Sequence, residues 1–313
     1  MDKKTERLVN VARMYYEQDR TQSEIADRYG ISRPMVSKLL KEARDRGIVT
    51  IRINAPKGES GGAPSLMELV GRCFGIYDGV AVPGGPNDQT TNEAVAEAAI
   101  SYLSGLGGTG LGIGWGHIIG DVVKHMEQKA KLVPIGTFVC PLIGNGGVGL
   151  KNYHSNELVR VIAEHSGAEP AFLYSPAYVL SEQELNLTKE LDNYRMVSEA
   201  WRKLDVALVN IGNFPSVPDF ASEARYGDVL VKQKAVGRIL NYFVNREGRI
   251  LYSETDYAIQ IPLELLRKTK HVVGICSANT SSAALRAVLR TGLVNYLIAP
   301  GRVVETALKE EMI

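Results

Sequence analysis

The chain has 313 residues, of which 45% are hydrophobic and 23% charged, and its formal net charge is +1. This length and balance exclude a lone DNA-binding module and a disordered chain, and they predict one small and one large globular domain. No apolar run approaches a membrane span, the first residues do not resemble a signal peptide, and three widely separated cysteines show no disulfide or metal-ligand spacing. We therefore expect a cytoplasmic protein with no membrane partner, metal or cofactor.

Charge is distributed unevenly along the chain. Residues 1–57 contain 13 Lys and Arg against 8 Asp and Glu, whereas the remaining residues contain 23 against 27. A basic N-terminal part followed by a slightly acidic body suits a protein that contacts DNA only through its N-terminal part.

Residues 21–46 predict a helix-turn-helix, preceded by a helix over residues 5–18. Thr21 and Glu24 have the spacing of a capping box, and Gly30 supplies a turn. Ser32 can cap the second helix, and Pro34 falls in its first turn, where a missing N–H costs little. The apolar residues at helical spacing in the second helix are Val36, Leu39, Leu40 and Ala43.

The outward face of the second helix is polar and basic, as required of a helix that enters the major groove. The alternative is a helical hairpin whose charges are only solvated. The complete order of cap, turn, second cap, proline and apolar repeat favours DNA binding. The residues predicted to contact double-stranded operator DNA are Thr21, Gln22, Ser32, Arg33, Met35, Ser37, Lys38 and Lys41.

Beyond the helix-turn-helix, residues 48–53 alternate with period two and predict a short strand of a wing. The Gly-, Pro- and Ser-rich residues 56–65 predict a linker. The expected domains are therefore a DNA-binding domain over 1–55, the linker, and an effector and oligomerisation domain over 66–313.

The body alternates apolar, strand-like runs with helical patterns. Such alternation predicts an α/β fold, a Rossmann-like parallel sheet with helices on both faces. Ligands bind such sheets at the carboxyl ends of the strands, where the strand order reverses. The strand-like runs are residues 79–83, 108–116, 134–144, 168–176, 206–214, 272–279 and 294–300.

Glycine-rich or polar loops follow four of these runs. Residues 110–120 end a strand and open a helix whose free N–H groups attract an anion, although tight strand–helix packing also explains these glycines. Residues 143–150 form a second glycine-rich segment, for which a flexible surface loop is the alternative. Residues 212–220 and 277–282 follow two further strands, and their serines can instead serve as helix caps.

We expect the effector pocket between loops 112–117 and 144–154, because both occupy the same edge of the sheet. The five histidines are scattered, and neither a G-x-S-x-G turn nor a Walker A sequence occurs, so no catalytic residue is predicted. The predicted effector-binding residues are Gly112, Gly114, Gly116, His117, Gly144, Asn145, Gly146, Gly147, Asn152, His154, Asn213, Ser277 and Ser281.

Over nearly its whole length the chain resembles the SorC family of bacterial transcriptional regulators. The resemblance implies a helix-turn-helix joined to a sugar-binding domain similar to glucosamine-6-phosphate deaminase and related isomerases. It also implies a dimer or tetramer that binds operator DNA and responds to a phosphorylated sugar. The segments that carry the resemblance are residues 12–49, LGIGWG at 111–116, NELVRVIAEHSGA at 156–168, AVGRILNYFVNREG at 235–248 and AALRAVLRTGLVNYLIAP at 283–300.

Several positions depart from the family pattern. His117 stands in the phosphate loop, where Thr or Ser is usual, and Arg238 stands where the family tends to carry Asp. Ser277, Ala278 and Ser281 replace a Gly-Gly pair and a lysine, and residues 299–300 replace Thr-Asp. These departures fall at the effector pocket, so they predict a sugar or polyol bound with little dependence on phosphate.

Three functions are compatible with the sequence. The first is a DNA-binding transcriptional regulator, a homo-oligomer, whose operator affinity is controlled by a sugar, sugar phosphate or polyol. The second is a sugar-phosphate isomerase or deaminase with a DNA-binding head, and the third is a DNA-binding scaffold without effector. We expect the first and not an enzyme, because the sequence offers no compelling acid/base pair near the glycine loops.

Overall fold

The computed structural model of the chain describes residues 3–18, 20–45, 48–49, 64–76, 78–106, 110–129, 132–147, 149–216 and 225–312. It divides into two compact units, the N-terminal unit (residues 1–62) and the C-terminal unit (residues 63–313). Most of the predicted strand over 48–53 and of the predicted linker over 56–65 lies outside the described residues.

The N-terminal unit contains three helices, α1 (Lys3–Tyr16), α2 (Gln22–Tyr29) and α3 (Arg33–Asp45). The predicted capping box opens α2: Glu24 N donates to Thr21 Oγ1 at 3.2 Å, and Thr21 N donates to Glu24 Oε2 at 2.8 Å. Gly30 ends α2 with φ 62, a left-handed conformation that glycine adopts without a steric penalty. The predicted helix-turn-helix is thereby confirmed.

The apolar faces of the three helices meet in a small core. Val11 of α1, Ile25 of α2 and Val36 of α3 are fully buried, and Leu40 is nearly so. Because this face of α3 packs inward, the opposite face of the helix points to solvent.

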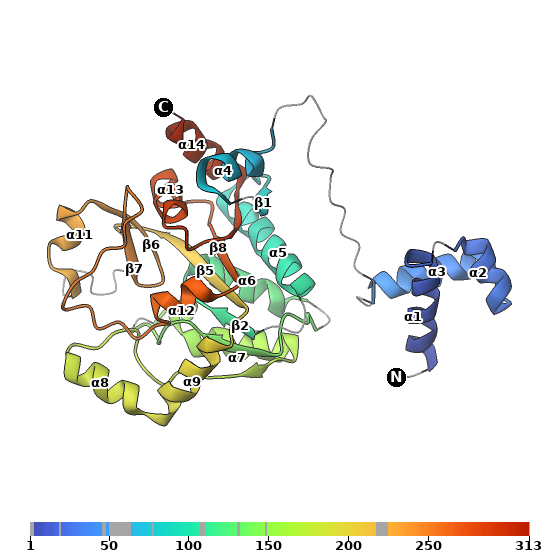
Figure 1. Ribbon diagram of the computed structural model, residues 1–313, viewed down its shortest axis with the longest axis horizontal. Coiled ribbons are helices and arrows are strands. Elements are labelled where there is room, and N and C mark those ends of the chain that lie inside the picture. The colour runs from blue at the N-terminus through green and yellow to red at the C-terminus, as the bar shows by residue number, and fades with distance from the viewer. Residues whose placement is uncertain are drawn as a thin grey trace. The chain divides into compact units, whose positions relative to one another are not determined.

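The C-terminal unit is built on a sheet with helices on both faces (Figure 1). Its seven parallel strands follow the order β1-β9-β8-β5-β2-β3-β4. The strand order reverses between β2 and β5, and the predicted parallel α/β fold is confirmed. These strands are β1 (Gly79–Val82), β2 (Gly110–Ile113), β3 (Phe138–Pro141), β4 (Glu169–Pro170), β5 (Val206–Asn213), β8 (His271–Ile275) and β9 (Tyr296–Pro300).

Helices cover the sheet in two groups. Helices α5, α6 and α7 pack one against the next, whereas α13 packs on α14 and α14 on α4 (Figure 1). The bounds are α4 (Leu66–Phe74), α5 (Asp88–Leu106), α6 (His117–Glu127), η1 (Lys151–Tyr153), α7 (Ser155–Ser166), α8 (Glu182–Glu190), α9 (Asp192–Arg202), α11 (Val229–Lys232), α12 (Leu263–Lys268), α13 (Ser282–Arg290) and α14 (Gly301–Glu311). No described helix is long and apolar enough to cross a membrane.

An antiparallel hairpin that the sequence analysis did not predict extends the sheet at β5. Its strands are β6 (Ala235–Ile239) and β7 (Tyr242–Asn245). The first half of β5 pairs with β2 and β8, while its last residues pair with β6, which sets Gly212 opposite Arg238. The hairpin therefore begins at the carboxyl edge of the sheet.

Two glycines of the loop after β3 are expected to differ in their tolerance of a side chain. A Cβ on Gly144 would lie 2.1 Å from the carbonyl oxygen of Pro176, whereas nothing described lies within 4 Å of a Cβ on Gly147. We expect Gly144→Ala to lower the free energy of unfolding by about 1–3 kcal/mol. Gly147→Ala should change it by less than about 0.5 kcal/mol. Urea unfolding measures both, and equal midpoints for the two variants would contradict this packing.

Candidate functional site

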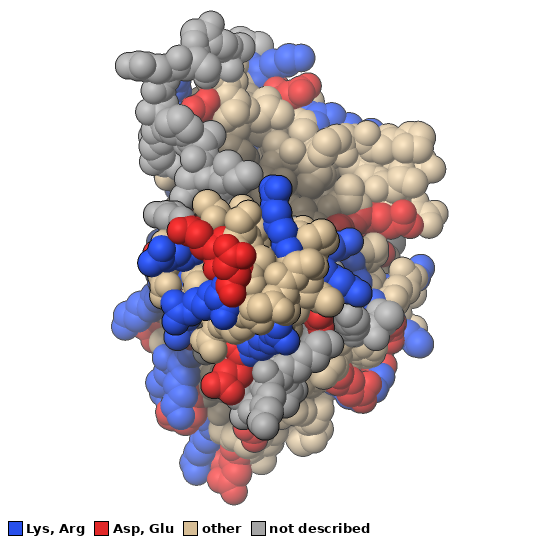
Figure 2. All heavy atoms as spheres, turned by 90° about the vertical axis from the view of Figure 1, so that its right-hand side faces the viewer, with Lys and Arg blue, Asp and Glu red and all other residues tan. Residues whose placement is uncertain are grey.

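The exposed face of α3 carries most of the residues predicted to contact DNA. Arg33, Ser37, Lys38 and Lys41 are exposed, and Met35 is 46% exposed, while Val36 lies in the core. Ser32, just before the helix, is exposed as well. In the view of Figure 2, separate Lys and Arg side chains stand out from the surface with Asp and Glu among them, without forming one large basic patch.

The start of α2 adds a second part to this surface. A hollow there is lined by Arg20, Thr21, Gln22 and Arg33, among others, so that the first residues of α2 and α3 share a wall. Thr21 is engaged in the capping box, and Gln22 is half-buried. Arg20, which the sequence analysis missed, lies 3.4 Å from Glu24 and is exposed.

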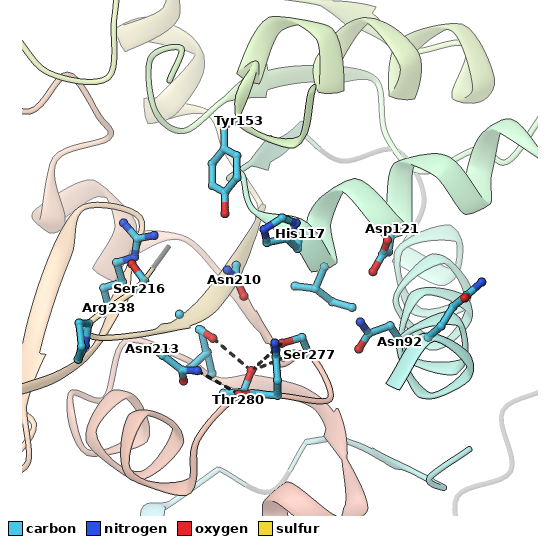
Figure 3. Close-up of a pocket in the computed structure, with 16 residues that line it drawn as sticks. Asn92, His117, Asp121, Tyr153, Asn210, Asn213, Ser216, Arg238, Ser277 and Thr280 are labelled. Carbon is cyan, nitrogen blue, oxygen red and sulfur yellow. Dashed lines mark hydrogen bonds between the residues drawn. The ribbon is translucent and has the colours of Figure 1, made fainter. Parts of the chain in front are cut away.

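The C-terminal unit has a cavity of about 680 Å³ at the carboxyl edge of its sheet (Figure 3). Its wall comes from the end of β5 and the loop after it, the start of α6, the loop after β8, the first half of α5 and β6. This is the point at which the strand order reverses, where ligands bind in open α/β sheets. The lining residues are Gln89, Asn92, His117, Ile118, Asp121, Tyr153, Asn210, Ile211, Gly212, Asn213, Pro215, Ser216, Arg238, Ser277, Asn279 and Thr280.

Three of the predicted effector residues, His117, Asn213 and Ser277, line this cavity. A fourth, Gly116, is the N-cap of α6 and lines a narrow pocket that shares Tyr153 and Arg238 with the cavity. Most of the polar wall was not predicted, because its residues are spread over α5, α6, η1, β5 and β6 and over the loops after β5 and β8.

Other predicted effector residues serve the packing of the sheet. A Cβ on Gly112 would lie 2.3 Å from Leu142, and one on Gly114 would lie 3.0 Å from Leu240. Close approach between β2 and its neighbours thus accounts for both glycines.

The loop over residues 144–147 packs away from the cavity. Asn145 N donates to Ser175 O at 2.9 Å, and the Asn145 side chain donates to Leu173 O at 3.3 Å. Gly146 N donates to Tyr153 O at 2.7 Å. This loop, including Gly144, therefore packs against the segment that leads to α8. Gly147, at the end of the loop, is exposed.

The remaining predicted residues lie at helix starts. Asn152 lies over Gly120 of α6, its side-chain nitrogen 3.5 Å from His117 Nδ1. His154 directly precedes α7. Ser281 caps α13, because its hydroxyl accepts a hydrogen bond from Ala284 N at 3.1 Å.

One end of the cavity is cationic. Arg238 is only 7% exposed and lies beside Ser216 in Figure 3. The start of α6 also faces the cavity through His117 and Ile118, and its N-cap, Gly116, has no side chain to occupy the free N–H groups. Burial raises the pKa of the Tyr153 phenol, and the charge of Arg238 acts in the opposite direction.

The other end of the cavity offers a carboxylate, that of Asp121, as a hydrogen-bond acceptor. Asp121 and Asn92 lie across the cavity from Arg238 (Figure 3). Burial raises the pKa of the Asp121 carboxyl, against the effects of Lys124, His117 and a hydrogen bond from Asn92. The Asn92 side-chain oxygen already accepts from Ala278 N at 2.7 Å, which turns its NH₂ group toward the carboxylate.

A hydrogen-bonded loop forms the floor between the two ends. Asn213 donates to Asn279 O at 3.0 Å and accepts from Ser281 N at 2.9 Å. Ser277 N donates to Thr280 Oγ1 at 2.9 Å. The loop after β8 is thus fixed to the end of β5, which holds the cavity in a preformed shape. Within the described ranges, no group of three or more His, Cys, Asp and Glu residues is placed to hold a metal ion.

Comparison with known proteins gives both units a counterpart. Residues 63–309 match the Sugar-bind family model, described as "Putative sugar-binding domain", and residues 5–46 match the model of sigma-70, region 4. The sorbitol operon regulator of Klebsiella pneumoniae is 28% identical and covers 96% of this chain and 97% of its own. The deoxyribonucleoside regulator of Bacillus subtilis is 26% identical, with 95% and 96% covered. The crystal structure of the full-length Klebsiella sorbitol operon regulator has a TM-score of 0.69 at 27% identity, covering 98% and 99% of the two chains.

Proposed function

Because the chain belongs to the SorC family of bacterial sugar-binding transcriptional regulators, we propose that a carbohydrate in the cavity controls operator binding by α3. The chain is a DNA-binding regulator and not an enzyme, as its full-length relatives are named as regulators. The observation that carries this proposal is the polar cavity at the reversal of strand order, on the same chain as a helix-turn-helix.

The charges in the cavity favour an anionic carbohydrate, such as a sugar phosphate. Arg238 and the start of α6 supply the two kinds of group that bind phosphate oxygens, a guanidinium and free helix N–H groups. Asp121 and Asn92 then face the hydroxyl groups at the opposite end of the ligand. This proposal replaces the expectation of little phosphate dependence, because that expectation treated Arg238 only as a departure from the family pattern and gave no weight to its positive charge in the cavity.

The DNA surface consists of the outward face of α3 and the start of α2. Base edges are contacted by Ser32, just before α3, and by the exposed residues at the start of α3 up to Ser37, and phosphates by Lys38, Lys41 and Arg20. A bacterial regulator of this kind acts in the cytoplasm, where its operator lies.

We expect Lys38→Ala and Lys41→Ala each to weaken DNA binding, because each removes a charge three residues from the other on the exposed face of α3. Affinity falls as salt rises, and loss of one phosphate contact should reduce the magnitude of the slope of log K against log salt concentration by about one. Gel-shift titrations at several salt concentrations measure this. Lys189→Ala, an equal change of charge on α8 of the other unit, is the control. Unchanged affinity in both α3 variants, with the fold intact, would refute the assignment.

Effector chemistry is tested with matched pairs, sorbitol against sorbitol 6-phosphate and glucose against glucose 6-phosphate. The wild-type chain should bind the phosphorylated member more tightly. Arg238→Gln should reduce this preference by about 10-fold or more, since a hydrogen bond to a charged group contributes about 1.5–3 kcal/mol. Asp121→Asn should instead weaken both members of a pair by a similar factor. Calorimetry measures all four ligands, and an undiminished preference in Arg238→Gln would overturn the anionic assignment.

Self-association completes the proposed function. One helix-turn-helix makes few contacts, and two-fold pairing of chains supplies two half-sites. We expect the full-length chain to be a dimer or tetramer at micromolar concentration. Light scattering coupled to gel filtration measures the mass, and a monomer of 34.2 kDa would contradict this expectation.

A further inference from the structure

The β6–β7 hairpin reaches from the cavity to the surface of α13. At its inner end, Arg238 lines the cavity and Leu240 packs over Gly114 of the loop after β2. At its outer end, in the turn just after β7, the backbone of Gly248 lies against α13, where a Cβ would come within 2.5 Å of the Cβ of Arg290. One short element therefore contacts both places.

Arg290 joins the outer end of the hairpin to α14. Its Nη1 donates to the carbonyl oxygen of Arg246 at 2.5 Å, and its Nη2 donates to both carboxylate oxygens of Glu311 at 2.8 and 2.7 Å. The side chain is 32% exposed and that of Glu311 is 18% exposed, so this ion pair is partly shielded from water. A single guanidinium thus ties the hairpin to the last turn of α14.

The series of contacts continues to the start of the C-terminal unit. Helix α14 packs on α4, which begins at Leu66 and is the first helix of this unit (Figure 1). The chain before α4 leads to the DNA-binding unit. The hairpin, Arg290, α14 and α4 therefore form an unbroken path from the cavity to the segment that connects the units.

The hairpin is also held in an unfavourable local conformation. Lys234 and Leu240 flank β6 with φ 54 and 52, and they are the two non-glycine residues in the described part of the chain with a left-handed backbone. The side-chain nitrogen and oxygen of the fully buried Asn241 have no hydrogen-bond partner among the described residues. Left-handed non-glycine residues and unpaired buried groups raise the energy of an element and bring a second conformation within reach.

We propose that the β6–β7 hairpin carries effector binding from Arg238 to α14 and α4, and that Arg290 is the positioning residue that links the hairpin to α14. The proposal rests on the proposed function. An anion bound at Arg238 stabilises one position of the hairpin over another, and Arg290 passes the difference to α14. Arg290 contacts neither effector nor DNA in this scheme.

The chain offers a matched control one turn away on the same helix. Arg286 pairs with Glu311 and Glu310 at 2.8 and 3.1 Å, and among the described residues it makes no hydrogen bond or ion pair to the hairpin. Arg286→Gln and Arg290→Gln therefore remove similar ion pairs, but only Arg290→Gln releases the carbonyl of Arg246. Arg290→Lys keeps the charge near Glu311 without the planar fork that holds both partners at once.

The first measurement is hydrogen exchange of the full-length chain without ligand. Arg290→Gln and Arg290→Lys should speed amide exchange at least about threefold over residues 235–248, including the cavity end at 237–240. Arg286→Gln should leave these amides unchanged. Equal effects in the two Gln variants, or faster exchange confined to residues 246–248, would overturn the proposal.

The second measurement uses an operator selected by the wild-type chain from random DNA, with sorbitol 6-phosphate as probe. The probe should change the operator affinity of wild type and Arg286→Gln by about 5–150-fold. It should leave the operator affinity of the two Arg290 variants unchanged. Calorimetric affinity for the probe should stay within about threefold in all of them. Retained control in the Arg290 variants would refute the link. If the probe does not bind wild type, the effector assignment fails, and hydrogen exchange alone decides the link.

Discussion

The pairing of β5 with two different partners is the constraint on which the cavity depends. Residues Val206–Asn210 pair in parallel with β8, and residues Ile211–Asn213 pair antiparallel with β6. The first four residues of β5 are buried at the centre of the sheet, so the strand cannot shift without disturbing the core. The end of β5 therefore fixes the positions of the asparagines in the cavity, and through Gly212 it fixes Arg238 as well.

Burial of Arg238 gives the cavity its electrostatic direction. Arg238 as a residue is 7% exposed, and a guanidinium so placed interacts with an anion more strongly than one in water, because less solvent screens the pair. Asp121, at the other end of the cavity, would carry a negative charge when ionised. Burial disfavours this charged form and raises the pKa of the carboxyl. An ionised carboxyl with a raised pKa lowers the stability of the folded state at neutral pH, a cost expected at a binding site rather than in a structural ion pair.

The sequence predicted those parts of the fold whose patterns are local. Six of the seven parallel strands lie in largely apolar runs, the exposed β4 (Glu169–Pro170) being the exception, and the helix-turn-helix is signalled by Thr21, Glu24 and Gly30 within ten residues. The β6–β7 hairpin was not predicted, because two-residue hairpin loops favour glycine where this chain has Leu240. Leu240 therefore explains why the hairpin was not predicted, and its left-handed backbone is also one of the reasons to regard the hairpin as strained.

The site was predicted less well, for a topological reason. Strand-following loops share the carboxyl edge, but periodicity does not tell which of them turn toward one another. Loop 144–147 bonds to Ser175 and Leu173, whereas the loop after β8 bonds to Asn213 and closes the cavity. Long-range pairing of this kind leaves no signal in residue spacing.

The departures from the family pattern acquire a common meaning once they are placed in space. His117, Arg238 and Ser277 are far apart in sequence but line one cavity, and Ser281 lies at its floor through Asn213. The resemblance places Asp at position 238 and Lys at position 281, a pair with no net charge, where this chain has Arg and Ser. Loss of the lysine alone would remove a cation from the loop before α13. Together, the two changes place the positive charge on β6, at the position where the family tends to carry the aspartate. At these two positions the exchange changes the net charge from zero to +1, and the positive charge lies on the hairpin and not on the loop before α13.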